Sequence, residues 1–360
     1  MKNYLTAGIE FSRLVRLMRR NAVSFYPKYF LRFMFLAQSA IWSDLFSWIE
    51  TKRFGEKIAA TPIPQDPIFI IGHWRTGSTL LHQLLNLDPN LAAPTLFQVA
   101  EPGCFICGYR YYLPIFAAMV PNHRPMDNVK IGMNEPQEDE YAIYRITDHS
   151  PIERLVFPKD KKYFLLDSCS FLPNDENEKN EWVEILCAYF KKLTFFHKKR
   201  IVSKNPFNSW RIIELAAMFP EAKFIHIVRH PYDVIPSTIN MWKIVLQQNS
   251  LNDKGSYPGI EEVTEGLAKI LTTIKRDSTV LQYENFYEMR FEDLEADPIA
   301  LIKEIYSRFH MPFTNELSNK IQSFMHDLKD YKKNEFQLDI KEKELIRKQL
   351  SQHMKIFNYQ

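Results

Sequence analysis

Short apolar runs alternate with stretches of helical periodicity through the middle of the chain. Ile68–Ile71 and Phe224–Val228 are mostly apolar, and each precedes a stretch in which apolar residues recur at helical spacing. Such runs with helices between them predict buried strands of a parallel sheet that helices cover on both faces. The expected strands are 68–71, 201–202, 224–228 and 287–291. The pattern therefore predicts an α/β fold.

The regions on either side of the predicted sheet are helical. Residues 1–60 show helical periodicity that ends near Thr61–Pro64, where two prolines break the pattern. We expect 1–60 to be an N-terminal helical segment, 61–330 the α/β domain and 331–360 a charged helical tail. Within the α/β domain, residues from about 100 to 200 contain helical pieces and acidic clusters, and we expect them to form a cap over the sheet.

The composition excludes several classes of protein. With 360 residues, of which 46% are hydrophobic and 25% charged, the chain has the composition of an ordinary globular protein. Its net charge of +3 is too small for general nucleic-acid binding, which needs a strongly basic domain. Cys104 and Cys107 are spaced C-x-x-C but lack the second ligand pair of a zinc site. We therefore predict buried thiols and no metal.

The N-terminal helices raise the question of a membrane. The first residues carry several arginines and no cleavage site follows, unlike a signal peptide. Residues 29–49 are apolar, but Arg32 and Asp44 interrupt them, and a spanning helix needs about 20 apolar residues. Residues 11–20 place arginines opposite an apolar face. We predict a cytoplasmic protein in which this face packs on its own domain, with peripheral contact to an anionic membrane as the alternative.

The segment Gly72–Thr79, which reads GHWRTGST, has the form of a phosphate-binding loop between a strand and a helix. Nucleotide hydrolases carry G-x-x-x-x-G-K-[ST] at this place, and here Ser78 replaces the lysine that reaches the β- and γ-phosphates. Backbone N–H groups and the helix dipole still favour an anion. Arg75 adds a charged planar donor two residues before Gly77. The loop therefore predicts a phosphate-like ligand other than the β- and γ-phosphates of ATP.

A second group of polar residues follows the other predicted strands. Arg229 stands at the end of 224–228 with Ser237 eight residues later, and Lys204 follows 201–202. Ligands of open α/β sheets bind at the carboxyl ends of the strands. Two phosphate sites without the ATP lysine suggest a nucleotide that carries a phosphate on its 3′ position. A kinase or NTPase is the alternative, with the run 162–167 ending in Asp167 as its magnesium-binding strand.

In combination these segments resemble one enzyme family. PIFIIGHWRTGSTLLHQLL resembles the 5′-phosphosulfate loop of sulfotransferases that use 3′-phosphoadenylyl sulfate (PAPS), and FIHIVRHPYDVIPST resembles their 3′-phosphate motif. MRFEDLEADP resembles a segment that these enzymes place near the adenine. RPMDNV and EPQEDE, at 124–129 and 135–140, resemble a bacterial branch that also carries GHWRSGTT. The resemblance covers about residues 67–310.

The resemblance implies a P-loop-like sheet and a role for individual residues. The residues that would hold the 5′-phosphosulfate are Arg75, Thr76, Gly77, Ser78, Thr79 and Leu80. Arg229 and Ser237 would hold the 3′-phosphate, and Phe291 stands where relatives place a tyrosine against the adenine. The C-terminal R-K-G-x-x-G-D-W-K segment of cytosolic relatives is absent. The stretch DYKKNEF, with Tyr331 and Lys332, is one candidate to replace it.

The implied reaction moves a sulfuryl group from PAPS to a hydroxyl acceptor, releases adenosine 3′,5′-bisphosphate (PAP) and needs no metal. A cation beside the leaving phosphate is most valuable in the transition state, and Arg75 and Lys204 are the candidates. Lys204 matches the lysine of the K-T-H segment of cytosolic relatives. That segment reads Lys204-Asn205-Pro206 here, so its histidine base is missing. The candidates for the general base are, in order, Glu138, Glu101 and His82.

The predicted acceptor follows from the aromatic and aliphatic residues of the cap. These include Phe97, Phe105, Tyr109, Tyr111, Tyr112, Phe116 and Met119. Such a lining favours an apolar alcohol, namely a sterol, a lipid or a phenol, over a saccharide, which is the alternative. A third hypothesis is a non-catalytic protein that keeps the fold, either as a nucleotide-binding protein or as a membrane adaptor.

Overall fold

The computed structural model describes most of the chain. The described residues are 5–21, 29–111, 113–117, 132–158, 175–251, 256–329, 334 and 336–359. Several residues named above lie outside these ranges. They are 124–129, Tyr112, Met119, Asp167, Tyr331 and Lys332.

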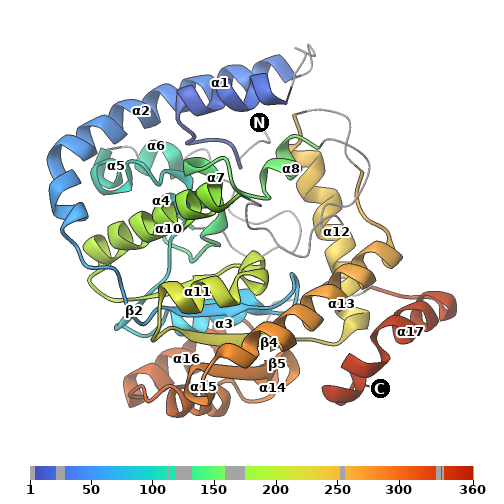
Figure 1. Ribbon diagram of the computed structural model, residues 1–360. Coiled ribbons are helices and arrows are strands. Elements are labelled where there is room, and N and C mark those ends of the chain that lie inside the picture. The colour runs from blue at the N-terminus through green and yellow to red at the C-terminus, as the bar shows by residue number, and fades with distance from the viewer. Residues whose placement is uncertain are drawn as a thin grey trace.

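A five-stranded sheet lies at the centre of the described chain (Figure 1). Its strands are β1 (Ile68–Ile71), β2 (Leu91–Ala92), β3 (Arg200–Lys204), β4 (Lys223–Val228) and β5 (Phe286–Arg290). The spatial order is β2-β3-β1-β4-β5, and all neighbouring strands are parallel. The predicted α/β fold with a parallel sheet is therefore confirmed. The sequence missed β2, which is only two residues long, and it placed Phe291 in a strand although the strand ends at Arg290.

Helices cover both faces of the sheet because β1 is apolar on both sides. Ile68 and Ile70 belong to a core cluster with α3 (Ser78–Leu85), α14 (Phe291–Ala296), α15 (Pro298–Arg308) and α16 (Asn315–Asp327). Phe69 and Ile71 belong to a larger cluster on the opposite face. The sheet helices there are α10 (Glu176–His197), α11 (Ile212–Met218), α12 (Pro231–Asn249), α13 (Ile260–Asp277) and α17 (Ile340–Ile356). Successive residues of a strand point to opposite faces, so this alternation produces the three-layer arrangement.

The region in which we expect the cap contains several short helices. They are α4 (Leu96–Ala100), α5 (Phe105–Tyr111), α6 (Leu113–Ala117), α7 (Glu140–Ile146) and α8 (Glu153–Val156). Single turns of 3₁₀ helix at Pro206–Trp210, Ser278–Val280 and Tyr283–Asn285 join larger elements. The predicted domain boundaries at about 60 and 330 stay a prediction.

The N-terminal segment forms α1 (Phe11–Arg20) and α2 (Phe30–Ala59), which lie along one edge of the molecule (Figure 1). Leu14 and Leu17 of α1 are fully buried, and Arg13 is buried in an ion pair with Asp148 at 2.7 Å. The apolar face of α1 therefore packs on its own domain, as expected. Among the helices described, none is both long and apolar enough to cross a membrane. The cytoplasmic location stays a prediction.

Candidate active site

The phosphate-binding loop occupies the point where the strand order of the sheet reverses. β1 has β3 on one side and β4 on the other, and the loop 72–77 leaves its carboxyl end to start α3. Ligands of open α/β sheets bind at such a switch point. Arg75 has φ of 68°, which is rare for a residue with a side chain. Backbone strain of this kind persists where the surroundings enforce it, and it is frequent at ligand sites.

Gly77, like Gly72 at the start of the loop, has a backbone conformation and close contacts that disfavour any side chain. It has φ of 89°, and a Cβ added to it would lie 2.0 Å from Cδ2 of Phe291. The same ring also contacts Arg229, whose guanidinium carbon lies 4.7 Å from the centre of the Phe291 ring. Phe291 thus supports both the loop and Arg229 from the first turn of α14, and it is only 5% exposed. Its predicted contact with adenine stays a prediction.

We expect Gly77→Ala to cost about 2 kcal/mol of folding stability, because the methyl group overlaps the Phe291 ring in a strained backbone conformation. Denaturant unfolding measures this cost, and PAP affinity should fall with it. Gly55→Ala is the matched control, since its added Cβ would meet only Thr51 Cγ2, at 3.5 Å. Equal stability of the two variants would contradict the close packing of Phe291 on the loop.

The two predicted phosphate sites meet in the structure. Arg75 Nε donates to Ser237 Oγ at 2.9 Å, although the loop and α12 are far apart in sequence. Arg229 donates through Nη2 to Asp233 at 3.1 Å, while its buried Nε finds no hydrogen-bond acceptor among the described residues. A buried guanidinium nitrogen without an acceptor is costly unless a ligand supplies one. The loop, Ser237 and Arg229 therefore lie together on one surface, and the binding of an anion there stays a prediction.

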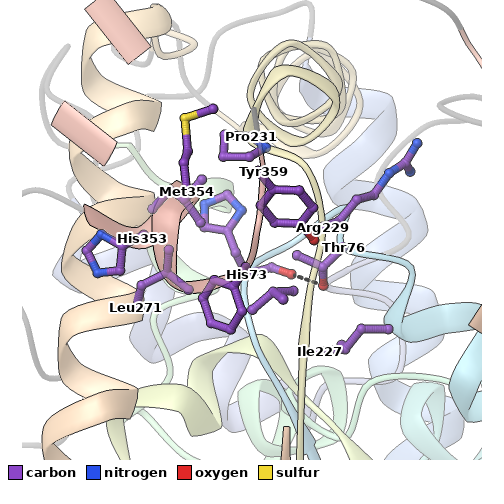
Figure 2. Close-up of a pocket in the computed structure, with 12 residues that line it drawn as sticks. His73, Thr76, Ile227, Arg229, Pro231, Leu271, His353, Met354 and Tyr359 are labelled. Carbon is purple, nitrogen blue, oxygen red and sulfur yellow. Dashed lines mark hydrogen bonds between the residues drawn. The ribbon is translucent and has the colours of Figure 1, made fainter. Parts of the chain in front are cut away.

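The C-terminal helix borders this surface, which the sequence did not predict. Thr76 of the loop and Arg229 line a pocket together with Tyr359 (Figure 2). The Tyr359 hydroxyl donates to Glu292 at 2.9 Å, and its ring centre lies 5.0 Å from that of His230. Thr76 itself donates to the carbonyl of His73 at 2.8 Å. The other lining residues are Ile227, Val228, Pro231, Leu267, Leu271, His353, Met354 and Phe357.

Lys204 and Glu138 form an ion pair at the carboxyl end of β3. Nζ of Lys204 lies 2.6 Å from Oε1 of Glu138, and the two side chains are 5% and 13% exposed. The neighbours of Glu138 continue the pairing: Ser203 donates to Asp139 at 2.6 Å, and Asn205 donates to Glu140 at 2.8 Å. Three successive carboxylates thus bind three successive residues at the carboxyl end of β3, which holds Glu138 next to the end of β1, where Ile70 pairs with Lys204.

Burial within this network changes the acidity of Asp139. Desolvation raises its pKa to about 6, and the charge of Glu140 acts in the same direction. Glu140 also accepts hydrogen bonds from Arg211 at 2.6 Å and Ser150 at 2.8 Å. Asp139 and Glu140 therefore hold the segment in place, and Glu138 is the member of the acidic cluster that pairs with Lys204.

The other two candidate bases lie in buried environments. Glu101 is fully buried at the end of α4 and accepts a hydrogen bond from Ser43 of α2 at 2.6 Å. His82, on α3, is also buried, and its Nε2 lies 3.3 Å from the Val202 carbonyl oxygen. Burial, and secondarily the charge of Lys204, lowers the pKa of His82 to about 3. Of the three candidates, Glu138 is the one in contact with Lys204.

His82 should make the protein sensitive to acid. Its pKa is about 3 in the folded state and 6.5 in the unfolded state, so the unfolded chain binds the proton more tightly. The contribution of neutral His82 to folding stability is therefore fully present above pH 6.5. It decreases as the pH falls below that value, by about 2 kcal/mol at pH 5. His82→Gln, which can keep the bond to Val202, should reduce the loss between pH 7.5 and 5 in denaturant unfolding. An unchanged difference between the two pH values would contradict this assignment.

Of the three described cysteines, Cys104 is buried as predicted, whereas Cys107 and Cys187 are partly exposed. Cys104, Cys107 and Cys187 are free, and burial raises the pKa of the Cys104 thiol far above its usual range. Within the described ranges no three His, Cys, Asp or Glu side chains gather as metal ligands would.

Comparison with known proteins identifies the family to which this site belongs. The model of the sulfotransferase family matches residues 67–315, which is more than half of the chain. The chain belongs to the sulfotransferase family. It is therefore a transferase of the EC 2.8.2 type, for which the family implies PAPS as the sulfuryl donor.

Curated relatives and solved structures agree with this family. The chain is 31% identical over 346 residues to the omega-hydroxy-beta-dihydromenaquinone-9 sulfotransferase Stf3 of Mycobacterium bovis and to that of Mycobacterium tuberculosis. These alignments cover 95% of this chain and 88% of each relative. The fold resembles sulfotransferase STF9 of Mycobacterium avium, with a TM-score of 0.64, 18% identity and coverage of 88% and 82%. It also resembles STF1 of Mycobacterium tuberculosis, with a TM-score of 0.60, 19% identity and coverage of 96% and 88%.

Proposed function

We propose that the protein transfers the sulfuryl group of PAPS to the hydroxyl group of an apolar, lipid-like alcohol and releases PAP. The observation that carries the proposal is the Lys204–Glu138 ion pair beside the phosphate-binding loop. It brings a cation for the leaving group and a carboxylate for the acceptor proton to one place. The loop residues Arg75 to Leu80 would bind the 5′-phosphosulfate, and Arg229 with Ser237 the 3′-phosphate.

In the proposed mechanism the acceptor oxygen attacks sulfur while the bond from sulfur to the bridging phosphate oxygen breaks. Glu138 takes the hydroxyl proton as the nucleophile forms its bond. Negative charge grows on the leaving phosphate oxygen, and Arg75 and Lys204 stabilise it.

The surroundings of the loop support an apolar acceptor. Trp74, next to Arg75, packs against Phe207, Trp210 and Trp242 with ring centres 4.9 to 6.3 Å apart. In the cap, Phe105 and Tyr109 pack on Phe196. Trp74, Phe207, Trp210, Trp242 and Phe105 are at most 5% exposed, so they make the interior around the loop apolar, and apolar surroundings favour an apolar ligand. The similar Stf3 enzymes act on a hydroxylated menaquinone, by their names, which supports a lipid alcohol more than a saccharide.

Turnover with purified protein and PAPS tests the proposal. We expect sulfation of a long-chain or isoprenoid primary alcohol and much slower sulfation of a monosaccharide at the same concentration. Preference for the saccharide would overturn the acceptor class. Tight PAP binding without turnover of any alcohol would favour a non-catalytic protein, and preference for ATP–Mg²⁺ over PAP would favour a kinase.

The 3′-phosphate assignment has its own test. Arg229→Ala should weaken PAP binding in calorimetric titration by roughly 1.5–3 kcal/mol, the value of a charged hydrogen-bonded contact. The affinity for AMP, which lacks the 3′-phosphate, should change much less. Arg347→Ala on the exposed side of α17 is the control for loss of a positive charge. Equal weakening of PAP and AMP would place Arg229 elsewhere in the site.

A further inference from the structure

One face of α2 exposes a row of large apolar side chains, in which Gln38 is the exposed polar residue between Met34 and Ile41. They are Phe30, Leu31, Met34, Ile41, Trp42, Leu45 and Trp48, and each is between 45% and 76% exposed. At 100° per residue these positions fall within an arc of about 120° on the helix. We call this row the α2 apolar face. The opposite side of the same helix is the buried one, with Leu36, Ala40 and Ser43 packed inward.

This arrangement reverses the usual one, in which the outer side of a surface helix is polar. Single exposed apolar residues are common, but a contiguous patch marks a surface that binds something. The tryptophans make the contrast clear, because the other four of the six in the chain are at most 5% exposed. Figure 1 shows α2 along the margin of the molecule, with no described element on its outer side.

The charges around the α2 apolar face are predominantly positive on the outside. Lys52, Arg53 and Lys57 are exposed on the last turns of α2, and Arg19 is exposed on the adjacent α1. Of the three acidic residues of α2, one is buried, one is half-buried and one is exposed. Asp44 accepts the backbone N–H of Phe11, and Glu50 is buried in an ion pair with Lys192, while Glu56 is exposed. An apolar row that contains tryptophan and ends in exposed cations matches the surface of an anionic bilayer.

We propose that the α2 apolar face docks the protein on a membrane that contains anionic lipids. The helix lies in the plane of the interface, with its tryptophan and leucine side chains among the upper acyl chains, about 5–10 Å deep. Lipid is favoured over a second copy of the chain because cations border the apolar row. Glu50, on the buried side of α2, accepts the N–H groups of Ile106 and Cys107 at 2.8 Å each, so α5 lies directly behind the docked helix. If the acceptor is a lipid alcohol, as proposed above, this position places the cap next to its source.

Tryptophan fluorescence tests the docking without donor or acceptor, so its outcome is independent of the proposed function. Vesicles of phosphatidylcholine with about one third phosphatidylglycerol should shift the emission to shorter wavelength, and acyl chains brominated near the headgroup should quench it. Trp42→Phe/Trp48→Phe should remove most of the spectral change, because the remaining tryptophans are buried. That variant should still sediment with vesicles, since phenylalanine remains apolar.

A triple variant, Trp42→Ser/Leu45→Ser/Trp48→Ser, should sediment with vesicles at least about tenfold more weakly than the parent chain. The matched control is Ile213→Ser/Ile340→Ser, which removes exposed apolar residues from α11 and α17 and should bind as the parent does. Pure phosphatidylcholine should bind less well than the mixed vesicles. Equal vesicle binding of the triple variant and the control, or no binding by the parent, would overturn the proposal. A dimer in light scattering that the triple variant abolishes, without vesicle binding by the parent, would assign the face to a second copy.

Discussion

Glu138→Gln should lower kcat by about 10²–10⁴, the range expected when a general base is removed, while PAP affinity stays within a few-fold of the parent value. The amide keeps the shape of the side chain and can still accept a hydrogen bond from Lys204, so the acidic segment should remain in place. What it cannot do is take a proton from the acceptor hydroxyl. The effect should therefore appear in turnover with the acceptor and not in donor binding.

Glu101→Gln is the matched control for this experiment. It makes the same chemical change at a carboxylate that is fully buried and bonded to Ser43. We expect the control to retain most of its kcat. It should lose some folding stability, because the neutral amide replaces a buried carboxylate around which the neighbouring side chains are arranged. A large loss of kcat in Glu101→Gln with little loss in Glu138→Gln would reverse the assignment of the base.

The parts of the site that the sequence predicted depend on local pattern. β1 and β4 are apolar runs of ordinary strand length, and the loop after β1 carries the glycine that its backbone conformation requires. From these two strands alone, the parallel arrangement places Arg75 and Arg229 at the same edge of the sheet. The direct contact of Arg75 with Ser237 follows from that arrangement.

The parts that the sequence missed depend on contacts between distant segments. The binding of 138–140 to 203–205 joins residues more than 60 positions apart, and charged residues in a loop usually read as a solvated surface. Tyr359 belongs to no motif, so its contact with Glu292 could be found only from the folded chain. The predicted strand 287–291 included Phe291, whereas α14 begins directly at the end of β5.

The α2 apolar face is a third feature that the sequence analysis did not identify. The periodicity of 11–20 drew attention to α1, whose apolar side is buried in the core. Residues 29–49 are too polar for a membrane-spanning helix, and the sequence analysis did not ask whether one side of this helix is apolar and exposed. A helix can be too polar to cross a bilayer and still expose one side that is apolar enough to lie on it.

Lys204→Met should lower kcat by about 10²–10³, the usual cost of removing one donor that stabilises charge in a transition state. PAP affinity should fall much less, because the charge on the bridging oxygen develops only as the bond to sulfur breaks. Methionine keeps the length of the side chain, so packing against the loop is largely conserved. Single-turnover sulfation and calorimetric titration with PAP, on the same preparation, separate the two effects.

Lys204→Arg tests whether the reaction needs only a positive charge at this position or also the geometry of the lysine ammonium group. It keeps the cation but carries it on a planar group, so it should recover part of the lost rate. The pairing with Glu138 adds a second expectation. Because each partner orients the other, Lys204→Met combined with Glu138→Gln should cost less than the sum of the single losses in free energy. Strict additivity would mean that the two residues act independently. Equal losses of PAP affinity and kcat in Lys204→Met would mean that Lys204 binds the nucleotide already in the ground state.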